Sequence, residues 1–407
     1  MKVAIIGGGP AGCAAAYYFH NVGCNEIVIY EQNDNLGGCS HTRFYDTIPY
    51  EFGPQILFTG KKWIQEFFSR WLVNKKPSFG NYQYLASVDG KLDNMHDFPV
   101  RASNVLKLDS PEKIIQELYE LNLDRPDYSN LENYCISRVG ETLYESYFKN
   151  YNRKAWGRDP KEIICDWVNF RPLSLAKQKG RFSGKWEGHP GNYNPLWEGL
   201  TQRAERISAT VTVDENYLFY ADGEQINADL ILSTISMNDK LEFMDTCKVY
   251  VAIKCDKTLM QSCFNTFPNH YNFVRLFEYK LQYEAESEYT LIDFAFPSQC
   301  RSHIDAFIKE AKWFCRTILK REWEDLWVDY REKVYPVATQ KSVGVFNQML
   351  EDIRHIPVIP LGRAGMHAYI SKDTCVRMAR DASLALNRLL DPKTKVDAIQ
   401  EIRKDLH

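Results

Sequence analysis

The sequence predicts an α/β protein in which distant parts of the chain complete one parallel sheet, with an inserted helical region and a second, antiparallel sheet. Three observations support this fold class. An apolar strand, a glycine-rich turn, a small-residue helix and a second apolar strand follow one another in residues 2–31. An amphipathic, mostly helical pattern runs through residues 61–151. Strand patterns return after residue 210 and continue to residue 361.

Size and charge limit the class of protein. The chain has 407 residues, of which 44% are hydrophobic and 25% charged, and its formal net charge is −3. This length predicts two or three domains with a ligand cleft between them. Because the chain has no overall basic field, we expect neither a nucleic-acid polymer nor an anionic membrane surface as a partner. No apolar stretch reaches about 18 residues without charges or breakers, so we expect no membrane span.

The cysteines and histidines point to neither disulfides nor metal. The eleven cysteines are odd in number and scattered, with no CxxC pair, which predicts reduced thiols. The histidines lack the spacing of a metal site, so no metal is predicted. Glycines and Pro10 interrupt the apolar run of residues 1–16, which favours a phosphate-binding turn over a secretory leader. We therefore expect a cytoplasmic protein.

The first element is a βαβ unit with a dinucleotide fingerprint. Gly7, Gly9 and Gly12 fit GxGxxG: the first permits a tight turn, the second lets backbone approach a pyrophosphate, and the third lets helix and strand pack closely. Glu31 ends the second strand 19 residues after Gly12 (31 − 12), where a carboxylate can accept hydrogen bonds from ribose hydroxyls. This context favours a Rossmann-like dinucleotide-binding domain over an ordinary glycine-rich turn.

A second glycine pair, Gly37 and Gly38, lies just beyond Glu31. Such a pair is typical of FAD proteins of the glutathione-reductase and amine-oxidase type, in which backbone passes close to the cofactor. We therefore predict FAD rather than NAD as the cofactor. A plain loop with two glycines is the alternative.

After the helical region we expect a strand over residues 210–219 and a buried strand over 229–236 that returns to the first sheet. The second sheet is expected to include strands over 250–254 and 289–296. A closing strand over 356–361 and a helix over 373–390 follow. The ends of the chain would then meet in one discontinuous domain. The predicted domains are 1–75 with 195–245 and 350–395 for FAD, 76–155 as a helical substrate domain, and 156–194 with 246–349 as an antiparallel-sheet substrate domain.

Two stretches combine aromatic and polar side chains in the way a nucleotide ligand needs. Residues 151–157 and 181–193 are rich in Tyr, Trp and Gly, which suits stacking a base and bonding a sugar, although core aromatics are the plainer interpretation. Near the end of the chain, Tyr335, Arg363 and Tyr369 supply hydroxyls and a guanidinium, the donors that a buried diphosphate requires.

These motifs together resemble the flavin-dependent UDP-galactopyranose mutases over nearly the whole chain. The matching segments are GGxxxT at residues 37–42, VGExxY at 139–144, YxxKxWGR at 151–158, an FxxxYxGxPxGGY-like run at 182–193, Arg275-Leu276-Phe277-Glu278 in place of TRIxExK, Tyr335-Pro336, and GRLGxYxYxDMD at 362–373. The resemblance implies that FAD acts in its reduced state. Its N5 nitrogen would attack the anomeric carbon of a UDP-linked sugar and expel UDP. The sugar would then close into the other ring form, and UDP would return, without net redox.

The resemblance also implies roles for individual residues. Those implied for catalysis, through the departing diphosphate, are Arg275, Tyr335 and Tyr369. Those implied for the cofactor are Gly7, Gly9, Gly12, Glu31, Gly37, Gly38, Arg363 and Asp373. Those implied for the substrate are Tyr151, Trp156, Trp186, Tyr193 and Arg171. No side chain need be the nucleophile.

Two positions depart from the family's pattern. Gln55 stands where the family has a histidine beside the flavin, so proton handling at the flavin could differ. Ser174 stands where the family has a diphosphate-binding arginine on a mobile loop, and a neutral Ser cannot replace a bidentate fork unless Arg171 or Lys177 substitutes for it. We therefore leave the sugar unnamed.

The sequence favours a FAD-dependent mutase that interconverts the pyranose and furanose forms of a UDP-linked sugar. Gln55 and Ser174 give some weight to a FAD-dependent oxidoreductase of the amine-oxidase type. A catalytically silent binding protein on the same fold is a third possibility, disfavoured by the intact glycine fingerprint. The oligomeric state is left open, a dimer included.

Overall fold

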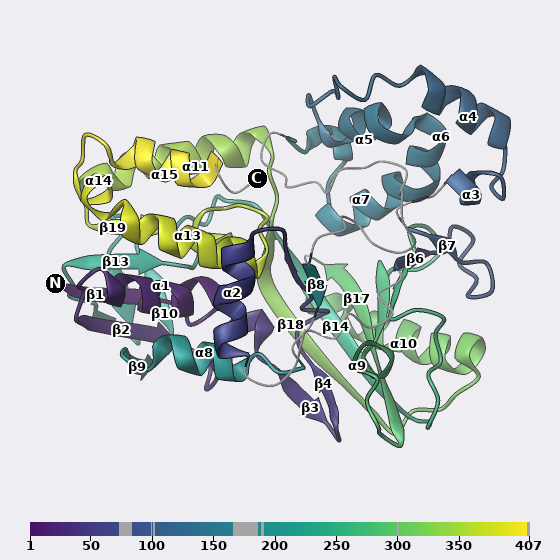
Figure 1. Ribbon diagram of the computed structural model, residues 1–407, viewed down its shortest axis with the longest axis horizontal. Helices are drawn as coiled ribbons and strands as arrows, with labels where there is room; N and C mark the ends of the chain where they lie inside the picture. Colours follow the sequence, from purple (N-terminus) through teal and green to yellow (C-terminus); the bar gives the residue numbers. More distant parts are fainter. Residues whose placement is uncertain are drawn as a thin grey trace.

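The computed structural model describes residues 1–72, 84–98, 100, 102–165, 186–188, 191–298 and 301–404. One part of the molecule is a parallel sheet covered by helices, and the other combines a larger sheet with the inserted helical region (Figure 1). Arg171 and the segment 172–185, which contains Ser174, lie outside the described residues.

The first sheet has five parallel strands in the order β19-β13-β1-β2-β9. They are β1 (Lys2–Ile6), β2 (Glu26–Glu31), β9 (Glu205–Ser208), β13 (Leu230–Ser233) and β19 (Val358–Pro360). The four residues of β13 are all buried and pair with β1, which confirms that this strand returns to the first sheet. Buried, continuously apolar central strands are expected where helices cover both faces.

Helices pack around this sheet and enclose the largest hydrophobic cluster. They are α1 (Pro10–Asn21), α2 (Lys62–Trp71), α8 (Asn194–Thr201), α11 (Gln340–Asp352), α12 (Gly362–Gly365), α13 (Lys372–Leu384), α14 (Leu386–Leu390) and α15 (Lys395–Lys404). The buried residues 11–16 of α1 are all small or Cys, which lets α13 and α8 approach closely. The single helix predicted over 373–390 is two helices, because the chain turns at Ala385.

The second sheet has seven strands in the order β18-β14-β17-β16-β15-β6-β7. They are β6 (Tyr84–Ala86), β7 (His96–Asp97), β14 (Phe243–Lys254), β15 (Phe264–Thr266), β16 (Arg275–Glu278), β17 (Tyr289–Ser298) and β18 (Asp325–Pro336). All pairings are antiparallel except that of β6 with β15.

The mostly helical pattern predicted over residues 61–151 is interrupted by β6 and β7, which extend the second sheet. Three buried residues in β6 are too short a pattern to distinguish a strand from a helical turn. What makes β6 a strand is its pairing with β15, about 180 residues away in the chain. The helices of this region are α3 (Ala102–Val105), α4 (Pro111–Glu120), α5 (Leu131–Val139), α6 (Glu141–Leu143) and α7 (Lys149–Trp156).

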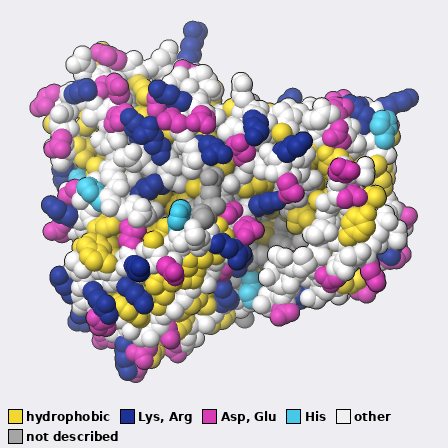
Figure 2. Space-filling model, turned by 180° about the vertical axis from the view of Figure 1, so that it is seen from behind, with side chains coloured by type: hydrophobic (Ala, Val, Ile, Leu, Met, Phe, Trp, Pro, Cys, Tyr) yellow, Lys and Arg dark blue, Asp and Glu magenta, His cyan; other side chains and the backbone are white. Residues whose placement is uncertain are grey.

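Short elements complete the fold. They are β3 (Arg43–Tyr45), β4 (Ile48–Tyr50), β5 (Leu57–Thr59), β8 (Trp186–Gly188), β10 (Val211–Val213), β11 (Phe219–Ala221), β12 (Glu224–Gln225), α9 (Tyr279–Tyr283) and α10 (Ile304–Phe314). The strand predicted over 210–219 is two strands, because β10 turns back and pairs with β11. On the face that Figure 2 shows, acidic and basic side chains are interspersed over the surface.

Candidate active site

The glycine-rich turn lies where β1 runs into α1, at the carboxyl edge of the parallel sheet. Gly7 has φ +95°, in the region that favours glycine. A Cβ on Gly12 would lie 1.9 Å from the Gly7 carbonyl oxygen, so only glycine lets the helix pack this closely. A Cβ on Gly9 would meet nothing within 4 Å, which leaves open space above that backbone. Such space at a helix N-terminus is where a pyrophosphate binds.

The second glycine pair lies against this turn. The Gly37 N–H donates to the Gly8 carbonyl oxygen at 2.7 Å, and a Cβ on Gly38 would lie 3.2 Å from the Gly9 Cα. Both residues have positive φ, +96° and +54°. The Glu31 carboxylate is 6% exposed and accepts from the Gly8 N–H at 2.7 Å. These residues form a backbone-lined cradle that fits the diphosphate and ribose of a dinucleotide.

Loops from the other end of the chain close on the same edge. A Cβ on Gly362 would lie 2.8 Å from the Ala11 Cβ, and one on Gly365 would lie 2.3 Å from the Ser233 carbonyl oxygen. The segment after β19 is thereby pressed against both α1 and the end of β13. Ligands of open α/β sheets bind at this carboxyl edge.

An aromatic cluster with one arginine forms the wall beside this segment. The Tyr369 ring lies 5.5 Å from the Trp156 ring and 5.5 Å from the Tyr335 ring, between centroids. The Arg363 guanidinium lies 5.2 Å from the Tyr369 ring and 5.3 Å from the Tyr335 ring, and it donates twice to the Ile370 carbonyl oxygen. The structure therefore brings together four of the predicted site residues from three parts of the chain.

Tyr335 and Tyr369 differ in exposure. Burial, together with Tyr369 beside it, raises the pKa of Tyr335 to about 12, so its hydroxyl stays protonated and can donate at neutral pH. Tyr369 is 37% exposed, which puts one wall of the cluster at the surface. Two phenolic donors are thus available to an anion at this wall.

Arg275, on β16, supplies the second positive charge. Its guanidinium lies 4.7 Å from the Phe264 ring, and its buried Nε has no hydrogen-bond partner among the residues that the structure describes. Burial acts to lower the pKa of this guanidinium, but Tyr335, Tyr151 and other neighbours outweigh it and the net shift is upward. A partly buried cation with an unused donor is suited to an anionic ligand.

A buried ion pair lies next to Arg275. The Lys248 ammonium and the Asp293 carboxylate are 2.9 Å apart, and their side chains are 2% and 0% exposed. A Cβ on Gly53 would lie 3.1 Å from Lys248 Nζ and 3.6 Å from an Arg275 nitrogen, so the three charges are close together. Because Lys248 already neutralises Asp293, the group keeps one net positive charge.

Lys154 joins the two halves of the site. Its ammonium donates to the carbonyl oxygens of Phe267 at 2.7 Å, Tyr271 at 2.9 Å and Phe273 at 3.3 Å. Lys154 lies on α7 near Tyr151 and Trp156, and the three carbonyls belong to the segment that leads into Arg275. This ammonium therefore holds the aromatic helix against the strand that carries the guanidinium.

We expect Lys154→Met to destabilise the protein by about 1–3 kcal/mol, since three carbonyl oxygens lose a charged donor. We also expect UDP to bind about tenfold more weakly, because the segment before Arg275 is loosened. Urea denaturation and calorimetric titration with UDP measure the two effects. Lys149 lies on the same helix as Lys154, and Lys149→Met, which removes an exposed bond to Glu145, is the control. Unchanged UDP affinity in Lys154→Met would rule out this positioning role.

The structure gives different information on the other predicted site residues. Asp373 lies at the start of α13, where the Ser371 hydroxyl donates to its carboxylate. Tyr151 lies close enough to Arg275 to raise the pKa of its guanidinium. Arg171 lies outside the described residues, and for Trp186 only the backbone is described, paired with Thr59 in β5 and β8.

Tyr193, predicted to line the substrate pocket, is a core residue here. It is 0% exposed and stacks on Trp197 at 6.0 Å between centroids. Its hydroxyl donates to the Gln55 carbonyl oxygen at 2.6 Å. The predicted contact of Tyr193 with the substrate stays a prediction. A glycine-rich aromatic run does not show which of its rings face inward.

Sequence reasoning missed several charged residues that the fold places here. The Arg331 guanidinium lies 4.5 Å from the centre of the Phe52 ring and donates to Cys39 Sγ at 3.6 Å. Cys39 directly follows the second glycine pair in the chain. Lys248 is a lysine at a buried position of β14, directly before the apolar run of residues 249–253. A charge inside such a strand pattern is a signal that could have indicated a functional position, because an unpaired buried charge is costly.

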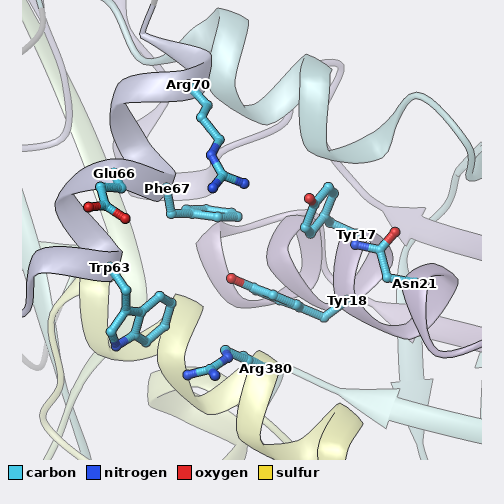
Figure 3. Close-up of a pocket in the computed structure, with 8 residues that line it drawn as sticks. All are labelled: Tyr17, Tyr18, Asn21, Trp63, Glu66, Phe67, Arg70 and Arg380. Atoms are coloured by element: carbon cyan, nitrogen blue, oxygen red, sulfur yellow. The ribbon is translucent and has the colours of Figure 1, made fainter.

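A separate pocket of about 230 Å³ lies between α1, α2 and α13 (Figure 3). Its lining residues are Tyr17, Tyr18, Asn21, Trp63, Glu66, Phe67, Arg70 and Arg380. The α1 residues among them lie in the second half of that helix, whereas the glycine turn is at its start. This pocket therefore belongs to the opposite end of the helix from the cradle.

Two features are absent from the described part of the chain. None of its helices is both long and apolar enough to cross a membrane. Within the same residues, no group of three His, Cys, Asp or Glu side chains is arranged to hold a metal ion.

The chain is similar to known proteins in sequence. Residues 5–71 match the model of an NAD(P)-binding Rossmann-like domain, and residues 146–309 match that of UDP-galactopyranose mutase. A dTDP-fucopyranose mutase of Escherichia coli is 26% identical over 208 residues, 49% of this chain and 53% of the relative. A probable UDP-galactopyranose mutase of Klebsiella pneumoniae is 24% identical over 215 residues, 51% of this chain and 54% of the relative. The chain spans about half the length of these curated relatives.

The fold of this chain is similar to that of solved structures. A solved structure of reduced UDP-galactopyranose mutase superimposes with a TM-score of 0.80 and 16% identity, covering 99% of this chain and 98% of the other. This likeness confirms the predicted α/β fold with its Rossmann-like domain. In sequence, this chain is thus similar to UDP-galactopyranose mutases and to a dTDP-fucopyranose mutase over part of its length, and its fold is that of the reduced UDP-galactopyranose mutase structure.

Proposed function

We propose that this chain is a FAD-dependent mutase that interconverts the pyranose and furanose forms of a nucleotide-linked sugar without net redox, with a UDP-sugar as its substrate. The observation that carries the proposal is the unneutralised Arg275 guanidinium. Its Nε has no partner, and the Tyr335 and Tyr369 hydroxyls lie near it. That donor set fits a diphosphate. The sugar mutases among the relatives make a nucleotide sugar the ligand to test first.

The residues of the site divide the work. Reduced FAD would supply the nucleophilic nitrogen that takes the sugar as the diphosphate leaves. The glycine cradle at Gly7, Gly9, Gly12, Gly37 and Gly38 would hold its phosphates, with Glu31 on the ribose and Arg363 and Asp373 nearer the ring. Arg275, Tyr335 and Tyr369 would stabilise the charge that develops on the departing diphosphate. Trp156 and Tyr151 would seat the base and keep water away.

Gln55 has a fixed side chain in this site. Its Oε1 accepts from the Ser40 hydroxyl at 2.8 Å, and its Nε2 donates to the Phe52 carbonyl oxygen at 3.1 Å. An amide neither gains nor loses a proton near neutral pH, so Gln55 can orient a neighbour but cannot relay protons. Proton handling in the proposed reaction would then differ from that of a site with histidine at this position.

The deciding experiment traps the sugar on the flavin. The protein is reduced anaerobically, incubated with UDP-hexoses, UDP-pentoses and dTDP-6-deoxyhexoses, treated with cyanoborohydride, and its flavin is analysed by mass. We expect a flavin heavier by one sugar, and the productive substrate identifies the sugar and the nucleotide. A flavin that stays bound and redox-active but unmodified across the panel would overturn the proposal. Oxygen consumption with amines would then test the oxidoreductase alternative.

We expect Tyr369→Phe to lower kcat for the sugar nucleotide by about 10–100-fold, since one hydrogen bond to a charged group contributes about 1.5–3 kcal/mol. The flavin content should equal that of the wild type, because only a hydroxyl is removed. Initial rates and flavin absorbance measure the two quantities. Tyr119→Phe, at a ring that is 91% exposed, is the control. Full activity in Tyr369→Phe would place the diphosphate elsewhere.

A further inference from the structure

Lys372, the first residue of α13, is a buried cation whose three acceptors are all uncharged oxygens. Its side chain is nearly enclosed, at 7% residue exposure. The ammonium donates to the carbonyl oxygens of Gln55 and Ile56 and to the Tyr193 hydroxyl at 3.1 Å. It also lies 4.3 Å from the centre of the Tyr193 ring.

No carboxylate of the described residues forms an ion pair with Lys372 within 4.0 Å. Burial lowers the pKa of its ammonium to about 7; the acids Glu51 and Asp373 act in the opposite direction, and Arg363 adds to the lowering. Glu51 is engaged by the Thr42 hydroxyl at 2.8 Å, and Asp373 by the Ser371 hydroxyl. The charge on Lys372 is therefore solvated by dipoles and not cancelled by a neighbour.

This charge lies between the two ends of the proposed site. Gln55, which Lys372 holds by its carbonyl, is bonded to Ser40, two residues after Gly38 of the cradle. On the other side, Lys372 follows Tyr369 of the diphosphate cluster by three residues. In the proposed site, a dinucleotide would have its phosphates at the cradle and its reactive ring at the sugar. It would therefore extend from the cradle to the diphosphate cluster, past Lys372.

The sequence motif sharpens the point. Where GRLGxYxYxDMD has methionine, this chain has Lys372, and where the family has histidine beside the flavin it has Gln55. In the structure, the Lys372 ammonium donates to the backbone carbonyl oxygen of Gln55, so the two positions are neighbours.

We propose, resting on the proposed function, that Lys372 supplies the positive charge beside the bound flavin and thereby stabilises the reduced, anionic form of the cofactor. Reduction adds negative charge to a flavin ring, and a cation in a low-dielectric site favours the more negative state. Lys372 acts through the field of its ammonium and by holding the Gln55 peptide in place. It needs no contact with the sugar.

The test is the reduction potential of the flavin in the holoprotein, measured anaerobically against a reference dye. The neutral variants Lys372→Met and Lys372→Gln are both expected to have a more negative potential than the wild type, while Lys372→Arg keeps it. Lys395→Met is the matched control, because Lys395 is 2% exposed and bonds to the Ile353 and Ile356 carbonyl oxygens. Absorbance of the reduced flavin across a pH series should show the anion forming at higher pH in the neutral variants.

Two results would overturn the inference: potentials of both neutral variants equal to that of the wild type, or an equal shift in Lys395→Met. These outcomes are independent of sugar trapping. A wild type that forms no sugar adduct contradicts the mutase proposal even if the potentials shift. Unmoved potentials in a protein that does form the adduct contradict only the role of Lys372. A wild type that binds no flavin contradicts both.

Discussion

Arg275→Met is expected to lower kcat/KM for the sugar nucleotide by about 10²–10⁴-fold, since two charge-assisted hydrogen bonds of about 1.5–3 kcal/mol each are lost. Arg275 is the cation whose Nε has no partner in the structure, and Lys248 already neutralises the nearest acid, Asp293. Of the donors proposed among the described residues, the two tyrosine hydroxyls and Arg363 would then remain for the diphosphate. Steady-state kinetics and calorimetric titration with UDP measure the loss.

The same variant should be as stable as the wild type or more stable. Arg275 is partly buried and forms no ion pair with a carboxylate of the described residues, and an apolar side chain of similar volume removes the cost of desolvating its charge. Urea denaturation should therefore show no decrease in the free energy of unfolding. Arg275→Lys keeps the charge but loses the fork, so its UDP affinity should be intermediate. Arg388→Met, at an exposed pair with Glu401, is the control. Wild-type UDP affinity in Arg275→Met would remove the main support for the proposed function.

Gly12→Ala is expected to destabilise the protein by more than about 3 kcal/mol, whereas Gly9→Ala should leave stability within about 1 kcal/mol of the wild type. The added Cβ at Gly12 would lie 1.9 Å from a backbone oxygen that cannot yield without opening the turn. At Gly9 the Cβ meets nothing within 4 Å, and φ −73° with ψ −175° suits alanine. Thermal and urea denaturation of the flavin-free protein measure the difference.

Flavin content separates fold from cofactor binding. We expect Gly9→Ala to purify folded but with little flavin, because its methyl group occupies the space proposed for the pyrophosphate. Gly344→Ala is the matched control, since a Cβ there also meets nothing within 4 Å but the residue lies on α11. If Gly9→Ala bound flavin as the wild type does, the phosphates would have to lie away from this turn.

Local patterns were enough to predict the parts of the fold that depend on near neighbours in the chain. The glycine fingerprint, the first βαβ unit and the buried strand that returns to it were all predicted, because turn geometry and strand periodicity act over a few residues. The pattern failed at β6, whose three residues become a strand only by pairing with β15. Nor does the motif around Tyr193 show which way its ring points, and the structure places that ring in the core.

By itself, then, the sequence determined the fold class, the dinucleotide turn and the resemblance to a mutase family, all of which depend on residue type and spacing. Only the tertiary structure decided which charges remain uncancelled. Arg275, Lys154, Lys248 and Lys372 are alike as basic residues in a sequence, but one lacks a partner for its Nε, one meets three carbonyls, one meets a carboxylate and one meets the Gln55 peptide. Electrostatic energy depends on distance and burial, and neither exists until distant parts of the chain are packed together.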